Sequence, residues 1–186
     1  RGLAGHSMGG YGTVRIGLKY PEVFSTLYSL SPCCMGANLE PNAEGAARAA
    51  AITTEAEIAA ADFGTKAVLA SAAAWSANPA KPPLYVDLPV EDGKVEPTVI
   101  ARWAANAPLA MVHQYVPALR SFTAIAVDAG DEDRGIAATV RELHGILDAY
   151  GIVHDYEIYA GDHINRIDER LSAKVLPFFS RHLSFQ

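Results

Sequence analysis

The sequence predicts an α/β protein, in which a mostly parallel β-sheet is flanked by helices and interrupted by a largely helical insertion. Three observations support this class. The amino-terminal segment leads through Gly5-His6-Ser7-Met8-Gly9 from a short strand into a helix. Strands and helices alternate again from about residue 122, and the stretch between these two regions shows no such alternation. Strand, helix and strand in succession are typical of a parallel sheet, because parallel strands need a crossover connection.

The composition limits the classes of function. With 186 residues, of which 50% are hydrophobic, the chain has the length of a single domain with one sizeable core. The net charge of −6 comes from scattered acidic residues without a run of Lys and Arg, so we do not expect a nucleic-acid partner. No apolar run approaches the roughly 20 residues that a membrane-spanning helix needs. A signal peptide would precede Arg1, so the sequence leaves the cellular location open.

The cysteines and histidines give no sign of a disulfide framework or a metal site. Cys33 and Cys34 are neighbours, and adjacent cysteines rarely form a disulfide because the ring that they close is strained. The six histidines are dispersed along the chain, without the Cys and His spacing that is typical of zinc sites. We therefore expect no metal ion and no cofactor.

The first element is a strand, a tight turn at Ser7 and a helix. The pattern Gly5-His6-Ser7-Met8-Gly9 is typical of a nucleophile elbow, in which the serine hydroxyl is exposed on a strained turn. Glycines stand two residues either side of the serine because a Cβ would collide where strand and helix cross. We predict a strand over residues 1–4 and a helix over 11–20, which Pro21 ends. The alternative is a Gly/Ser turn that only caps a helix.

The chain then divides into three parts. Residues 1–36 form the elbow part of the sheet domain and include a predicted buried strand over 26–31, followed by Pro32. Residues 37–121 are predicted to be the insertion, which is rich in alanine in its first half and in proline in its second. Residues 122–186 are predicted to complete the sheet domain.

Within the insertion we predict short helices separated by proline and glycine. A capping box of Thr54 and Glu57 indicates the start of one helix, and Thr65 is expected to open another after a break at 62–64. Leu84 to Leu88 is predicted to be extended, and Asp92-Gly93 to form a turn. The predicted helices cover 42–51, 54–61, 65–75, 98–105 and 109–115.

Four aromatic residues between 37 and 121 are candidates for the walls of a substrate pocket. The alternative is that they form the core of the insertion itself, and this use of buried aromatic side chains is the more common one. These residues are Trp75, Tyr85, Trp103 and Tyr115.

The last part of the chain returns to strands and helices. We predict strands over 122–127 and 155–159, with a helix between them that ends near Gly151. That helix shows an apolar stripe at helical spacing, and the chain closes with an amphipathic helix. The two stripes are Ile136, Val140, Leu143 and Leu147, and then Ile167, Leu171 and Val175.

A serine hydroxyl needs a base within hydrogen-bond reach and a group that orients the base. His163 follows the end of a predicted strand and is the candidate base. Three acids follow the preceding strand, and we favour Asp133 over Asp131 and Asp128, because Asp133 stands on the loop where it can reach the next strand end. The order serine, acid, histidine fits strands whose carboxyl ends share one edge of the sheet.

These motifs together resemble the α/β-hydrolase superfamily, and within it the esterases of the esterase D type, which include S-formylglutathione hydrolases, feruloyl esterases and mycolyltransferases. The resemblance rests on Gly-His-Ser-Met-Gly-Gly, Tyr-Pro-Glu-Val-Phe, Ser-Pro, Asp-Ala-Gly-Asp-Glu-Asp and Tyr-Ala-Gly-Asp-His. It implies hydrolysis of a small-molecule carboxylic ester or thioester through an acyl-enzyme. Ser7 would attack, His163 would carry the proton and Asp133 would hold the imidazolium.

The resemblance also implies an oxyanion hole that uses the backbone N–H of Met8 and a second N–H from a loop after an earlier strand. Two alternatives stay open: acyl transfer to an alcohol or sugar at the same site, and a non-catalytic binding module on the same fold. The elbow strand is central in this fold, so one of its edges would be bare. We therefore expect a preceding segment of the same protein or a second chain to pair with it, and a homo-oligomer is possible in principle.

Overall fold

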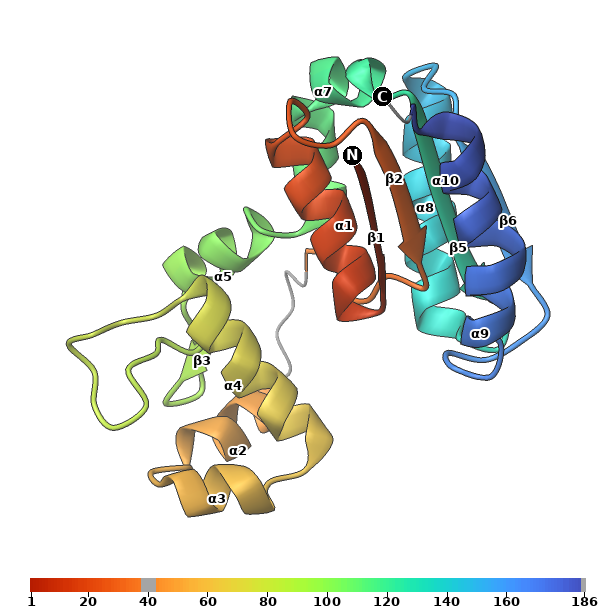
Figure 1. Ribbon diagram of the computed structural model, residues 1–186. Coiled ribbons are helices and arrows are strands. Elements are labelled where there is room, and N and C mark those ends of the chain that lie inside the picture. The colour runs from red at the N-terminus through yellow and green to blue at the C-terminus, as the bar shows by residue number, and fades with distance from the viewer. Residues whose placement is uncertain (38–42, 185–186) are drawn as a thin grey trace. The chain divides into compact units, whose positions relative to one another are not determined.

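The computed structural model describes residues 1–37 and 43–184 (Figure 1). The chain forms two compact units. The first consists of Arg1–Gly36 and Ala107–Gln186, and the second of Ala37–Asn106. Within the described residues, no helix is both long enough and apolar enough to cross a membrane.

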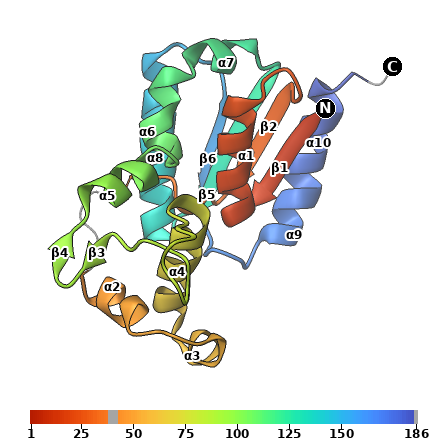
Figure 2. The ribbon, with the colours of Figure 1, turned by 90° about the vertical axis from the view of Figure 1, so that its left-hand side faces the viewer.

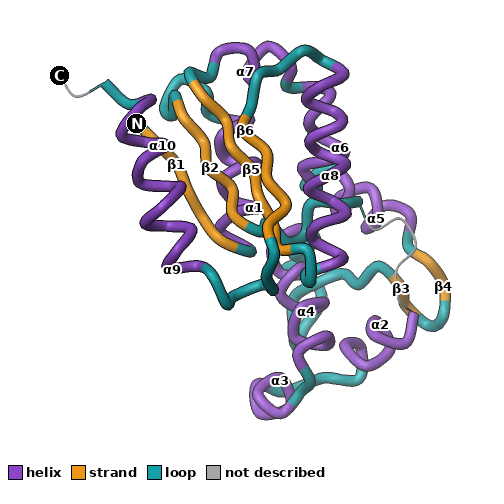
Figure 3. Tube along the Cα trace, turned by 90° about the vertical axis from the view of Figure 1, so that its right-hand side faces the viewer, coloured by secondary structure: helices purple, strands orange, loops and turns teal. Residues whose placement is uncertain are grey.

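The first unit is built on a four-stranded parallel sheet with the strand order β1-β2-β5-β6 (Figure 3). In the register of the sheet, His6 lies opposite Leu30, and Leu30 lies opposite Asp128, so the carboxyl ends of the strands share one edge. Among the described strands β1 pairs with β2, and the expected partner on its other edge stays a prediction. The strands are β1 (Gly2–His6), β2 (Thr26–Leu30), β5 (Ala124–Gly130) and β6 (Asp155–Tyr159).

Helices cover both faces of this sheet (Figures 1 and 2). Alternate side chains of β5 point to opposite faces, as in any strand. Ile125 and Val127 pack against α1 (Met8–Lys19) and α8 (Arg134–Ala149), whereas Ala126 packs with residues of η2 (Leu171–Val175) and α10 (Leu176–His182). All five residues of β2 are buried. The α/β architecture that the sequence predicts is confirmed.

The second unit ends at Asn106, whereas the sequence predicted an insertion as far as 121. The reason is that Leu109, Val112 and Leu119 are buried in the same core as α1 and α8, so this stretch belongs to the first unit. It forms α6 (Pro108–Met111), the 3₁₀ turn η1 (Val112–Gln114) and α7 (Val116–Ser121).

The second unit is mainly helical and has a core of its own. A hairpin turns at Asp92-Gly93, where both residues have positive φ, as the sequence predicted. The capping box of Thr54 and Glu57 is also formed. The elements of the second unit are α2 (Ala43–Ala50), α3 (Glu55–Ala60), α4 (Phe63–Trp75), β3 (Val90–Glu91), β4 (Lys94–Val95) and α5 (Pro97–Ala104). The core of this unit is made of Ala49, Ile52, Leu69, Ala72, Val86 and Leu88. Asn42, predicted to begin the first helix, lies outside the described residues.

Two predictions in this unit are wrong. Helix α4 begins at Phe63 and not at Thr65, because the Asp62 carboxylate accepts from the backbone N–H of Thr65 and caps the helix two residues earlier. The segment from Leu84 to Leu88 is not extended throughout, because Leu84 and Tyr85 lie in a turn where Tyr85 has a φ of 55°. It makes an isolated bridge between Val86 and Ala77.

Element boundaries and one apolar stripe in the first unit also differ from the prediction. Helix α1 begins at Met8, directly after the serine, and not at residue 11. Strand β5 runs to Gly130 and not to 127, so Asp128 is inside the strand. In the carboxyl-terminal helices, α9 (Ile167–Arg170), η2 and α10, Leu171 is exposed and Arg170 is buried, because the Arg170 guanidinium meets Asp128.

Candidate active site

The turn between β1 and α1 holds Ser7 in a strained conformation, with φ of 57° and ψ of −116°. A Cβ on Gly5 would lie 2.3 Å from the backbone carbon of Gly9, so strand and helix approach too closely there for any side chain. The strain costs on the order of 1–3 kcal/mol and persists only where surrounding bonds hold it. The Ser7 N–H donates to the Leu30 carbonyl at 3.0 Å, and the N–H of Cys33 donates to the Ser7 carbonyl at 3.2 Å.

Three predicted residues form one chain of hydrogen bonds. The Ser7 Oγ lies 2.9 Å from His163 Nε2, and His163 Nδ1 lies 2.5 Å from Asp133 Oδ2. An ionised carboxylate can only accept, so Nδ1 carries the proton and Nε2 presents its lone pair to the serine hydroxyl. This is the tautomer that a general base for Ser7 needs.

The loops that carry the acid and the histidine are fastened to each other. The Asp131 N–H donates to the Tyr159 carbonyl at 2.8 Å, and the Gly161 N–H donates to the Asp131 carboxylate at 3.0 Å. Asp131 therefore joins the ends of β5 and β6, while Asp133 is the acid that reaches His163. The two carboxylates between which the sequence left a choice thus have different partners in the structure.

His6 has a role that the sequence did not reveal. Its ring lies 4.6 Å from that of His163, centroid to centroid. Its Nε2 lies 2.8 Å from the His163 carbonyl oxygen, which can only accept, so His6 donates. The residue before the nucleophile therefore holds the backbone of the candidate base.

Asp128, the third acid that the sequence offered, is expected at a strand edge but is buried inside β5. Its Oδ2 accepts from the Tyr28 hydroxyl at 2.9 Å and from the Arg170 guanidinium at 2.6 and 3.0 Å. Burial raises the pKa of Asp128, and Arg170 acts against that rise. Hydrogen bonding by Arg170 lowers the pKa of Glu157, its second acidic partner, to about 2. Asp128 therefore serves the structure of the sheet and not the hydrogen-bonded chain of Ser7.

Comparison with protein families decides the assignment. The model of the family described as "Putative esterase" matches residues 1–167 of this chain. The chain belongs to this esterase family. A comparison with curated proteins finds no match.

Solved structures show the same fold. A ferulic acid esterase has a TM-score of 0.56 at 20% identity, over 98% of this chain and 52% of that one. An S-formylglutathione hydrolase from Staphylococcus aureus has a TM-score of 0.52 at 17% identity, over 95% and 49%. The fluorophosphonate-binding serine hydrolase F of Staphylococcus aureus has a TM-score of 0.55 at 18% identity, over 95% of this chain and 52% of that one. The chain thus spans about half the length of these proteins, and the predicted α/β-hydrolase fold of the esterase D type is confirmed.

Met8, the predicted oxyanion-hole donor, is the first residue of α1. The first N–H groups of a helix have no acceptor within the helix, and the helix dipole makes that end attractive to negative charge. The side chain of Met8 is exposed. This position suits the role that the sequence predicted, which stays a prediction.

The two cysteines, considered above only for a disulfide, lie beside the nucleophile in this member of the esterase family. The Cys33 N–H donates to the Ser7 carbonyl, and the Cys33 Sγ lies 2.9 Å from that of Cys34. The hydrogen bond with Cys34 lowers the pKa of Cys33 to about 7, against the effect of burial. The same bond and burial raise the pKa of Cys34. Cys33 is therefore the more reactive thiol of the pair.

The four aromatic residues proposed as pocket walls fall in both units. Trp75 and Trp103 pack edge to face with centroids 5.6 Å apart, and Trp103 Nε1 donates to the Ser76 hydroxyl. Trp103 also packs on the core of the second unit, as the alternative interpretation holds. Tyr85 is half-exposed in the second unit, and Tyr115 packs against the core of the first. Their role in a substrate pocket stays a prediction.

Proposed function

We propose that this chain carries the nucleophile, base and acid of a serine esterase that cleaves carboxylic esters or thioesters through an acyl-enzyme. The observation that supports the proposal is the continuous chain of hydrogen bonds from Ser7 through His163 to Asp133. Membership of the esterase family supports the reaction class.

The proposed reaction uses the three hydrogen-bonded residues in turn. Ser7 Oγ attacks the substrate carbonyl while His163 Nε2 takes its proton, and Asp133 stabilises the imidazolium that forms. The imidazolium then gives the proton to the leaving alcohol or thiol. Water attacks the acyl-enzyme while His163 Nε2 takes its proton. His163 then returns that proton to Ser7 Oγ as the bond to the acyl group breaks and the carboxylic acid leaves. The Met8 N–H is assigned to the oxyanion that develops in both steps.

The substrate class is proposed from the relatives. Their names include a ferulic acid esterase and an S-formylglutathione hydrolase, that is, a phenolic acid ester and a thioester. A panel of short-chain p-nitrophenyl esters, a feruloyl ester and a thioester would order these substrates by kcat/KM. Product analysis with added alcohols in the same assay would reveal acyl transfer, if ester products exceed free acid.

Labelling with a fluorophosphonate probe tests the nucleophile. Mass spectrometry of the labelled protein is expected to place the adduct on Ser7, and Ser7→Ala is expected to abolish both labelling and hydrolysis. An adduct on another residue, or full hydrolysis by Ser7→Ala, would refute the proposal. A folded protein that neither labels nor hydrolyses any ester would instead identify a non-catalytic binding module.

A pair of matched variants tests the acid. Asp133→Asn should lower kcat by about 10⁴-fold, because an amide that donates to Nδ1 imposes the wrong tautomer on His163. Asp131→Asn keeps an acceptor oxygen for the Gly161 N–H and should retain most of kcat. Equal losses in both variants, measured on proteins with native circular dichroism, would contradict the assignment.

A further inference from the structure

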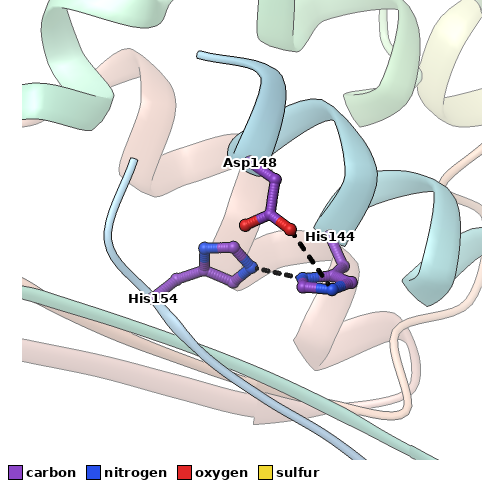
Figure 4. Close-up of side chains that lie close together, drawn as sticks. All are labelled: His144, Asp148 and His154. Carbon is purple, nitrogen blue, oxygen red and sulfur yellow. Dashed lines mark hydrogen bonds and ion pairs between the residues drawn. The ribbon is translucent and has the colours of Figure 1, made fainter. Parts of the chain in front are cut away.

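A second cluster of ionisable side chains consists of His144, Asp148 and His154 (Figure 4). His144 and Asp148 stand one turn apart near the end of α8, and His154 directly precedes β6. His163 follows the other end of β6, so the two sites are separated by the length of that strand. The proposed esterase reaction makes no use of these three residues.

The three side chains lie close together, with the His144 ring between its two partners. His144 Nδ1 lies 2.8 Å from His154 Nε2, and His144 Nε2 lies 3.4 Å from Asp148 Oδ2. One ligand atom from each residue lies within 4.8 Å of the others. Two imidazoles and a carboxylate are ligands that Zn²⁺ and its neighbours in the first transition row favour.

Surrounding contacts orient both rings. His154 Nδ1 lies 2.8 Å from the Ile152 carbonyl oxygen and must donate to it, so the lone pair of Nε2 faces His144. A hydrogen bond from the second ring nitrogen to a backbone carbonyl is the usual support of a metal-bound histidine. The His144 ring stacks on Tyr156, with centroids 3.9 Å apart and planes 3° apart. Neither ring needs to reorganise much to bind an ion.

The two ring nitrogens of His144 face different partners, Nδ1 toward His154 and Nε2 toward Asp148. An ion held by all three residues therefore uses one nitrogen of His144, and the partner on the other side of the ring must move toward it.

We propose that His144, Asp148 and His154 bind one divalent transition-metal ion, for which Zn²⁺ is the probe. Bonds of about 2.0–2.1 Å in tetrahedral geometry place ligand atoms about 3.3 Å apart. The His144–His154 separation must widen slightly, and the Asp148 carboxylate, whose side chain is 60% exposed, must rotate inward. The ion would fasten the end of α8 to the start of β6 and stabilise the fold, without a part in ester cleavage.

The sequence predicted no metal because the histidines are dispersed. The spacing of His144 and Asp148, four residues apart on a helix, places both on one face and was an available signal. His154 joins them only because α8 and β6 are connected by a short turn and pack side by side.

Calorimetric titration of the full chain with Zn²⁺ tests the proposal. All titrated proteins carry Cys33→Ser and Cys34→Ser, because the two thiols would also bind a soft ion. We expect one equivalent to bind, with affinity reduced at least tenfold in His144→Ala and in His154→Ala. His113→Ala is the matched control, because His113 hydrogen-bonds to Tyr150 outside the cluster, and it should keep full affinity. Mg²⁺, a hard cation that prefers oxygen ligands, should not compete.

Two further measurements keep the test decisive if an alanine variant does not fold. At a free Zn²⁺ concentration 100 times Kd, the melting temperature of the unmodified chain should rise by roughly 5–10 °C. Zn²⁺ should also shift the side-chain ¹⁵N resonances of His144 and His154 and leave those of His113 in place. Absence of binding by the folded protein, full affinity in either alanine variant, or unshifted resonances of the pair would overturn the proposal.

Discussion

Replacement of Arg170 by methionine is expected to destabilise the first unit strongly and to impair catalysis. The Arg170 side chain is 3% exposed and that of Asp128 is 1% exposed. Two guanidinium bonds reach Asp128 Oδ2, while the other carboxylate oxygen, Oδ1, has no hydrogen-bond partner among the described residues. Methionine has a similar shape but no charge, so the variant leaves Asp128 with the Tyr28 hydroxyl alone as its donor.

The size of the effect follows from this burial. Removal of one partner from a buried ion pair costs about 3–5 kcal/mol, because the remaining charge is uncompensated. Against a total stability of about 5–15 kcal/mol this is a large fraction. For a chain of this length, each kcal/mol of lost stability lowers the melting temperature by about 2–4 °C, so the melting temperature of Arg170→Met should fall by roughly 6–20 °C.

The loss of stability in Arg170→Met should depend on pH. Burial already raises the pKa of Asp128, and removal of Arg170 should raise it further, so the folded variant favours the uncharged carboxyl. The penalty is therefore smallest below the pKa of the unfolded carboxyl, about 3.9, and grows as the pH rises through the folded pKa. Urea unfolding followed by circular dichroism at pH 5 and pH 8 measures this difference.

A double variant supplies the control. Arg170→Met combined with Asp128→Asn removes the buried charge as well and should recover much of the lost stability, since a buried pair as a whole contributes little. The kcat of the variants should follow the same order as their stability. The reason is that Arg170 also lies over the Tyr159 ring at 4.4 Å and so joins the strands that lead to Asp133 and His163. A loss below about 1 kcal/mol at pH 8, or a double variant no more stable than Arg170→Met, would refute this reasoning.

Two other predictions concern the candidate active site. Gly130→Ala should lower kcat at least tenfold, because its Cβ would lie 2.2 Å from the Gly161 carbonyl oxygen and would push apart the loops of the acid and the histidine. Gly145→Ala, on an open face of α8, is the matched control and should retain activity, and p-nitrophenyl acetate hydrolysis compares the two. Iodoacetamide should alkylate Cys33 before Cys34, at a rate that rises with pH and reaches half its maximum near pH 7, and should inactivate the protein in parallel. Peptide mapping that finds Cys34 modified first, or full activity after modification of Cys33, would contradict the second prediction.

The sequence alone determined the elements whose signals are local. Gly5 precedes Ser7 because a Cβ there would collide with the backbone of Gly9, so the elbow could be predicted without a fold. The same reason, predicted for Gly9, is wrong, since a Cβ on Gly9 would meet nothing within 4 Å. Strand β6 was predicted with its observed bounds, because a short β-branched and aromatic run between turn residues has few alternatives. The types and order of the serine, acid and histidine also followed from positions after strand ends. The choice of Asp133 over Asp131 was a preference until the contacts of both were visible.

The tertiary structure decided every feature that depends on a distant partner. Asp128 was predicted to follow a strand that ends at residue 127, but it lies inside β5, where Arg170, 42 residues later in the chain, compensates its buried charge. His6 meets His163 across 157 residues, and periodicity carries no information about such pairs. The boundary of the second unit at Asn106 follows from the core that α6 and α7 join, not from their composition. Local sequence thus fixes strand, turn and helix, whereas burial of charge and the grouping of histidines depend on which elements pack together.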